Sequence, residues 1–128
     1  MINKYNLKIL RFWSRRFMDN SEIVDALSGV WYLATAEDDQ PHVRPLDKAA
    51  EIDGKVYFGT SRAKRMFAQI EQNSKVEIYA MNEFGACRFM AEAVVEEDDA
   101  KTKEAFEKME KPMDENSVAI WFDKIRKA

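Results

Sequence analysis

The stretch FGTSRAKRMFAQIEQN, residues 58–73, joins a strand pattern to a helix pattern and decides how the rest of the chain is interpreted. Its second half predicts a helix, because apolar residues recur at the spacing of one helical face. These residues are Ala63, Met66, Phe67 and Ile70. Thr60 and Ser61 stand where an N-cap is expected, so the sequence predicts a helix that begins at about Ser61.

Three cations occupy the first turn of this predicted helix: Arg62, Lys64 and Arg65. The N-terminus of a helix is the positive end of its dipole, so a cation there is unfavourable by roughly 0.3–1 kcal/mol. A second predicted helix, at about residues 98–110, has the conventional order instead, with acids at its start and lysines at its end. The first helix therefore needs a separate explanation.

An anion at the start of the first helix supplies that explanation. Free backbone N–H groups, the hydroxyls of Thr60 and Ser61 and the ammonium of Lys64 would converge on a phosphate, and the dipole would then favour binding. The alternative is a solvated basic turn on a surface helix. The stretch contains neither a Walker loop nor a dinucleotide-binding glycine motif.

The length and composition predict one globular domain. The chain has 128 residues, a single cysteine and a single histidine. Cys87 alone excludes an internal disulfide and fits a reducing compartment, so we expect a cytoplasmic protein. His42 alone argues against a Cys/His metal cluster, and we expect no metal site. No apolar run approaches the roughly 20 residues of a membrane span.

Charge divides the chain at about residue 18. Residues 1–18 hold five cations and no acid, whereas residues 19–128 hold 15 basic and 23 acidic residues, a net charge of −8. An acidic body is a poor match for nucleic-acid binding. We expect residues 1–18 to be a basic extension, either poorly ordered or a short amphipathic helix for a partner or a membrane surface, and residues 19–128 to be the folded domain.

Alternating apolar residues predict a mainly β fold with flanking helices. A short helix is expected from Asn20 or Ser21 to about Ser28. Strand patterns follow at residues 31–37, from about 42, in the segment with the Asp53-Gly54 turn signal, from about 75, from about 85, and at 117–122 before a basic tail. We interpret them as a six-stranded antiparallel sheet that curls into a small barrel.

The segment PHVRPL places Arg44 in a strand. Alternation puts Arg44 and His42 on one face and Val43 on the other, and Pro45 predicts an edge strand or a bulge. An arginine beside a cleft suits a phosphate or an electron-rich ring, whereas the plainer interpretation is an exposed edge charge. His42 is interpreted as a strand-edge histidine rather than a proton donor, and Cys87 as a buried small side chain.

Three segments together resemble the FMN-binding split barrels related to pyridoxamine 5′-phosphate oxidase. They are WYLATAEDDQPHVRPL, DGKVYFGTSRAKRMFAQIEQNSKVEIYAMN and CRFMAEA, in the order and at the spacing of that family, and the resemblance runs from about Met18 to the end. In size the chain is similar to the small general-stress and nitroimidazole-reductase-like members.

The resemblance implies a set of cofactor-binding residues. It implies that FMN is bound with its phosphate at Thr60, Ser61 and Lys64. It implies that the flavin ring borders Val43, Arg44 and Pro45, with Phe58 and Gly59 lining the ring pocket. It further implies a homodimer with FMN at the interface, in which Arg88 faces the partner's site and Trp121 lies near it.

The resemblance also implies the function. We expect an FMN-dependent oxidoreductase that acts on a small molecule, with no assigned catalytic residue because the cofactor carries the reaction. True pyridoxamine phosphate oxidation is not expected, since the chain ends at Ala128, before the C-terminal segment of those enzymes. The alternatives are a non-catalytic FMN-binding electron carrier or redox and stress sensor, and a relative that binds haem or deazaflavin.

Overall fold

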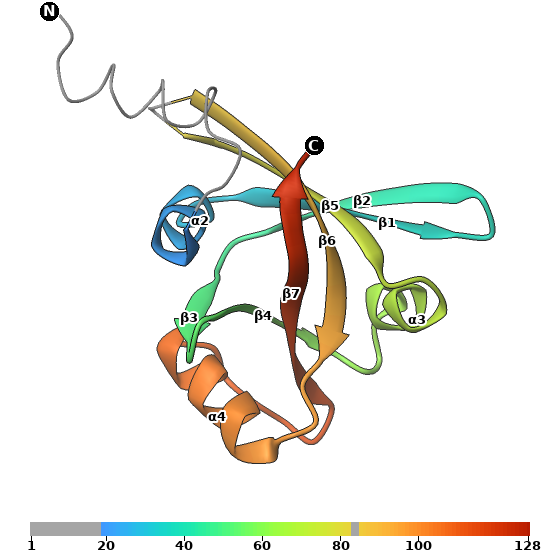
Figure 1. Ribbon diagram of the computed structural model, residues 1–128. Helices are drawn as coiled ribbons and strands as arrows, with labels where there is room; N and C mark the ends of the chain where they lie inside the picture. Colours follow the sequence, from blue (N-terminus) through green and yellow to red (C-terminus); the bar gives the residue numbers. More distant parts are fainter. Residues whose placement is uncertain (1–18, 83–84) are drawn as a thin grey trace, which may run out of the picture.

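The computed structural model describes residues 19–82 and 85–128 (Figure 1). In this part of the chain three helices lie against one antiparallel sheet with the strand order β2-β1-β5-β6-β7-β4-β3. The strands are β1 (Trp31–Glu37), β2 (Gln40–Leu46), β3 (Ala50–Ile52), β4 (Lys55–Ser61), β5 (Lys75–Asn82), β6 (Gly85–Val95) and β7 (Ser117–Lys127). The helices are α2 (Asn20–Ala26), α3 (Arg65–Gln72) and α4 (Asp99–Lys108). The predicted fold class is confirmed, with seven strands in place of six.

Two-residue turns close the predicted hairpins. Asp38 and Asp39 link β1 to β2 with φ of 48° and 67°, and Asp53 and Gly54 link β3 to β4 with φ of 52° and 79°. Positive φ at both central residues matches the twist of antiparallel strands, and Asp and Gly tolerate it. β2 lies at one end of the strand order, as Pro45 predicted.

Strand β4 is buried on both faces and separates two apolar cores. Val56 and Phe58 pack in the larger core, enclosed by the curved sheet, α2 and α3. Tyr57 packs in a smaller core under α4, together with Phe106. This double burial explains why the strand reads KVYFGTS, with little of the alternation that a half-exposed strand shows.

An aromatic cluster fills the centre of the larger core. The Phe58 ring stacks on Phe122 at 5.1 Å between centroids and meets Trp31 edge-on at 5.7 Å. Phe58 is only 1% exposed. Its side chain therefore belongs to the interior of the sheet.

Strand β7 is longer than predicted. The sequence indicated a strand over residues 117–122 and then a basic tail, but β7 continues to Lys127 because Arg126 and Lys127 pair with Met90 and Phe89 of β6. The alternating sequence pattern ends before the strand does, because Lys124 has φ of 52° and the β6–β7 ladder is irregular between Met90 and Glu92. The tail is thus part of the sheet.

The expected basic extension, residues 1–18, lies outside the described residues. Within the described ranges, no helix has the length and apolar character that crossing a membrane requires. The same ranges contain no group of three or more His, Cys, Asp or Glu residues arranged to hold a metal ion.

Gly59 is required by its contact with α4. A Cβ built on Gly59 would lie 2.8 Å from Cζ of the buried Phe106 ring. We predict that Gly59→Ala lowers the free energy of unfolding by about 1–3 kcal/mol, because the added methyl group would displace the buried Phe106 ring. Urea denaturation measures the change.

Gly29→Ala is the matched control for this substitution. A Cβ at Gly29 meets nothing within 4 Å, so we expect a change within about 0.5 kcal/mol. If both variants are equally stable, the close packing of Phe106 on β4 does not constrain the fold.

Candidate functional site

The turn between β4 and α3 is held by the sheet rather than by a helix cap. Ser61 still pairs with Ser117 of β7, and the Arg62 N–H donates to Asn116 O at 2.8 Å. The Ser61 hydroxyl accepts from the Ala63 N–H at 3.2 Å. The chain therefore stays extended through Ser61, and the helix begins only at Arg65.

The predicted N-cap was wrong for this reason. Lys64 occupies the N-cap position with extended backbone angles, and its side chain makes no capping hydrogen bond. The first turn of α3 contains no acid. The helix N-terminus is thus left without a side-chain acceptor, which is the arrangement that an external anion can complete.

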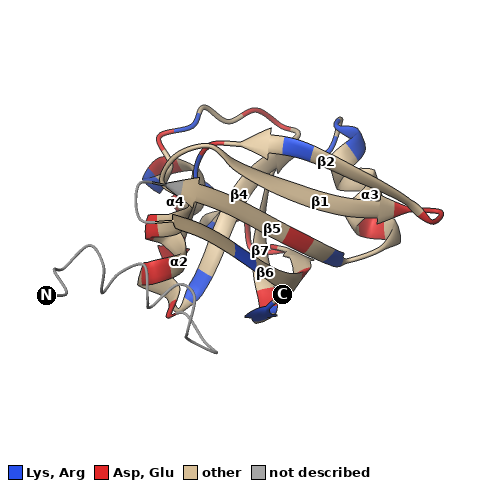
Figure 2. Ribbon diagram, turned by 90° about the horizontal axis from the view of Figure 1, so that it is seen from above, with Lys and Arg blue, Asp and Glu red and all other residues tan. Residues whose placement is uncertain are grey.

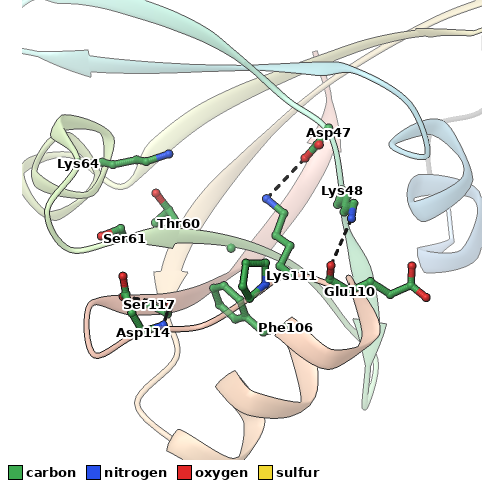
Figure 3. A pocket seen from close by; sticks show the side chains of 12 residues that line it. Asp47, Lys48, Thr60, Ser61, Lys64, Phe106, Glu110, Lys111, Asp114 and Ser117 are labelled. Carbon is green, nitrogen blue, oxygen red and sulfur yellow. Dashed lines mark hydrogen bonds and ion pairs between the residues drawn. The ribbon is translucent and has the colours of Figure 1, made fainter.

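A cavity of about 380 Å³, which we call the turn pocket, opens beside this turn (Figure 3). It is lined by Asp47, Lys48, Gly59, Thr60, Ser61, Lys64, Phe106, Glu110, Lys111, Pro112, Asp114 and Ser117. Lys111 pairs with Asp47 at 3.5 Å, and Lys48 Nζ lies 3.5 Å from Glu110 O. Lys64 makes no side-chain ion pair or hydrogen bond to any residue that the structure describes, so its ammonium is available to a ligand.

Thr60 carries a buried hydroxyl without a partner. The residue is 8% exposed and lines the turn pocket, yet Oγ1 makes no hydrogen bond to any residue that the structure describes. An unsatisfied buried polar group costs about 1–3 kcal/mol. In Figure 3 this oxygen lies on the same side of the pocket as the Lys64 ammonium. A hydrogen-bonding ligand in the turn pocket would satisfy Thr60.

A second cavity of about 520 Å³, the strand pocket, lies between β2 and the start of α3. It is lined by His42, Val43, Arg44, Pro45, Leu46, Lys64, Arg65, Met66 and Gln69. Three of these residues are Lys or Arg, and none is acidic. Figure 2 shows the basic segments of β2 and of the turn before α3 close together. Lys64 borders both pockets.

Arg44 is tied into a buried polar network beneath the strand pocket. Its Nη1 donates to Leu33 O at 3.1 Å and to Thr35 Oγ1 at 2.9 Å, and its Nη2 donates to Gln69 Oε1. The Thr35 hydroxyl also donates to Gln69 Oε1, at 2.7 Å. Burial lowers the pKa of the Arg44 guanidinium, but an arginine of this kind stays charged. The exposed edge charge considered from the sequence is instead half-buried.

The structure brings most of the expected site residues to the two pockets. Gly59, Thr60, Ser61 and Lys64 line the turn pocket. Val43, Arg44 and Pro45 line the strand pocket.

Three expected site residues line neither of these two pockets. Phe58 lies in the aromatic core. Arg88 is exposed on β6, opposite Tyr79. Trp121 is half-buried beside α4, with Lys55 Nζ 4.2 Å from its ring centre.

Two residues of the site were missed in the sequence. Thr35 and Gln69 are 3% and 2% exposed and together hold Arg44. Gln69 carried a signal, because it follows Met66 by three residues and so falls on the buried face of α3. A polar side chain at such a position needs a partner, although nothing in the sequence indicates which one.

His42 and Cys87 have the environments that the sequence indicated. His42 lies on the edge strand, with Nε2 3.9 Å from a Glu37 oxygen, and it also lines the strand pocket. Cys87 is buried, and burial raises the pKa of its thiol to about 11. The thiol is therefore protonated at neutral pH, as expected of a small core residue.

Comparison with known proteins gives consistent matches. Residues 21–126 match the family model described as pyridoxamine 5′-phosphate oxidase. A NimC/NimA family protein from Clostridium acetobutylicum is 33% identical over 82% of each chain, with a TM-score of 0.73. General Stress Protein 26 from Bacillus anthracis is 18% identical over 84% of this chain and 95% of its own, with a TM-score of 0.62.

A FAD-binding protein from Mesorhizobium loti has the same fold, at 18% identity and a TM-score of 0.60 over 84% of this chain and 92% of its own. No curated protein matches the chain. The split-barrel architecture predicted from the sequence is confirmed by these matches.

We predict that Gln69→Leu destabilises the protein by about 1–3 kcal/mol, because Arg44 and Thr35 would lose a shared buried acceptor. Gln72→Leu is the matched control. Gln72 lies on the same helix and, among the described residues, its side chain bonds to the exposed Asp38, so we expect a change within about 0.5 kcal/mol. Equal free energies of unfolding in urea for the two variants would contradict a stabilising role of the network.

Proposed function

This chain belongs to the pyridoxamine 5′-phosphate oxidase family, and we propose that it is a flavoprotein that binds FMN at the turn between β4 and α3. The unpartnered buried hydroxyl of Thr60 is the observation that supports this proposal most directly. A phosphate oxygen is an acceptor for the Thr60 O–H, for the Lys64 ammonium and for the free N–H groups at the start of α3. The residues present therefore fit a phosphate monoester.

The strand pocket extends this site beyond the phosphate. We assign the border of the flavin ring to Val43, Arg44 and Pro45, which lie next to Lys64 in the strand pocket. Gly59 lets the chain pass close under α4 at the turn pocket. Phe58, which the resemblance placed at the ring, supports the site from the core.

We propose that the protein is an oxidoreductase. FMN supplies hydride or electron transfer when it is bound, and the protein supplies binding and orientation. A non-catalytic electron carrier or redox sensor is the second candidate, because binding FMN does not by itself require catalysis of a substrate reaction. Bleaching of the yellow protein when NAD(P)H is added would support the enzyme, whereas a yellow protein that is inert to NAD(P)H and to common acceptors would support the carrier or sensor.

We also propose a homodimer with the flavin at the interface. An apolar face on β1, β2 and β5 supports this proposal, since Tyr32, Val43 and Met81 are 42%, 68% and 64% exposed. Arg88 lies on the same outer face, one strand beyond Tyr79. In such a dimer Arg88 and Trp121 of each subunit would serve the partner's site. Sedimentation at the mass of one chain would contradict the dimer.

We place the protein in the cytoplasm, because a single buried cysteine fits a reducing compartment. Haem is a poor alternative to FMN, since His42 is the one histidine of the sequence and lies within 4 Å of Glu37.

FMN titration of the purified protein tests the proposal. We predict that the wild type binds FMN and that Lys64→Glu weakens binding by roughly 100-fold or more, because a charge-assisted hydrogen bond is replaced by repulsion. Lys103→Glu, on the exposed face of α4, makes the same charge change away from both pockets and should bind FMN as the wild type does. Equal FMN affinity of Lys64→Glu and wild type would refute the phosphate site.

Thr60→Val separates binding from folding. In the flavin-free protein we expect an increase in stability of about 1 kcal/mol, because an unsatisfied buried hydroxyl is removed. FMN affinity should fall about tenfold, because the phosphate loses a donor. The two effects have opposite signs, and a purely structural hydroxyl would not change FMN affinity. Thermal denaturation without flavin and FMN titration measure them separately.

A further inference from the structure

The backbone at the end of α4 holds Lys111 beside the turn pocket. The chain leaves the helix through a Schellman motif, in which the Lys111 N–H donates to Phe106 O and the Glu110 N–H donates to Glu107 O, each at 3.0 Å. Glu110 has φ of 55° at the position where glycine is usual. Pro112 follows and restricts the backbone of Lys111 further. The lysine stem therefore starts from a fixed point on the wall of the pocket.

The ammonium of Lys111 has a loose partner. Its Nζ lies 3.5 Å from Asp47 Oδ1, whereas a charge-assisted N–H···O bond is about 2.7–2.9 Å long. The side chain of Lys111 is 26% exposed and that of Asp47 is 63% exposed. Water can solvate Asp47 without the lysine, but a largely buried ammonium needs an acceptor. Lys111 thus gains more from a partner inside the turn pocket than Asp47 loses by releasing it.

Lys111 and Lys64 enter the turn pocket from different elements. Figure 3 shows both ammonium groups directed into the pocket, Lys64 from the turn before α3 and Lys111 from the end of α4. The hydroxyl of Thr60 lies on the side of Lys64. This hydroxyl is buried and has no partner among the described residues, so the space that the two lysines border already lacks one acceptor.

The acidic residues of the turn pocket differ in what they face. Asp114 accepts a hydrogen bond from a backbone N–H of its own loop at 2.8 Å. The carboxylate of Glu110 is directed away from Lys64 in Figure 3. Asp47 alone pairs with Lys111 among the described residues. A phosphate monoester carries up to two negative charges, so it attracts an ammonium more strongly than one exposed carboxylate does.

We propose that Lys111 is a second phosphate-binding lysine, which exchanges Asp47 for the phosphate when FMN occupies the turn pocket. Thr60 and Lys64 then hold the phosphate from the side of α3, and Lys111 holds it from the side of α4. This inference rests on the proposed FMN site and adds a residue from a distant part of the sequence. Two ammonium groups match the charge of a phosphate dianion, so the site selects a phosphorylated flavin over riboflavin.

Titration of the full chain with FMN and with riboflavin, followed by flavin fluorescence, tests this inference. Riboflavin has the same ring and ribityl chain without the phosphate, and we expect the wild type to bind it at least about tenfold more weakly than FMN. Lys111→Gln keeps a polar side chain and removes the charge. It should weaken FMN binding about tenfold and leave riboflavin binding unchanged, because the lost contact is to the phosphate.

Lys103→Gln is the matched control for the loss of charge. It makes the same substitution on α4, at an exposed position that lines neither pocket, and should bind FMN as the wild type does.

Asp47→Asn tests the exchange from the other partner. It removes the competing carboxylate, so we expect FMN affinity to rise about threefold while riboflavin affinity stays the same. The two partners of one ion pair then change FMN affinity in opposite directions, which a purely structural pair would not do. Urea denaturation without flavin measures the structural part, and the exposed Asp47 keeps the inference testable if Lys111→Gln fails to fold.

Three outcomes would overturn the inference and leave the FMN site in place. They are wild-type FMN affinity in Lys111→Gln, an equal loss of FMN and riboflavin affinity in that variant, and weaker FMN binding in Asp47→Asn. A wild-type protein that does not bind FMN would refute the flavin proposal and this inference with it. The two failures are therefore distinguishable.

Discussion

The antiparallel pairing of β4 with β7 is the constraint on which the functional region depends. It continues through Ser61 and is extended by the bond from the Arg62 N–H to Asn116 O, so the chain cannot coil into a helix until Lys64. The sheet thereby positions a helix N-terminus, an unpartnered hydroxyl and a free ammonium around one cavity. The cations of the turn before α3 therefore lie beside a helix N-terminus, where a cation is unfavourable unless an anion is bound.

Burial of β4 on both faces holds the turn between β4 and α3 in place. The larger core holds Phe58 from inside the sheet, and α4 covers the outer face through Phe106. Gly59 lies where a Cβ would come within 2.8 Å of the Phe106 ring of α4. The turn therefore leaves a strand that is packed on both sides, which suits a binding site that has to keep its geometry without its ligand.

Local patterns predicted much of this fold, since turns with Asp and Gly and alternating apolar residues depend only on neighbours in sequence. The start of α3 was predicted wrongly, because residues 61 and 62 pair with residues 116 and 117, far along the chain. The same limit applies to the site. Thr60, Ser61 and Lys64 were found through an unusual charge order, whereas Thr35 and Gln69 contact Arg44 across three elements, and no local pattern encodes such contacts.

Lys64 has a consequence that follows from its place between the two cavities. One ammonium cannot fully neutralise an anion on each side at once, so occupants of the two cavities would share a single counter-charge. Their affinities are then thermodynamically linked, and by reciprocity each would change the other by the same factor. Electrostatic coupling of this kind through the charge of Lys64 would weaken as ionic strength rises.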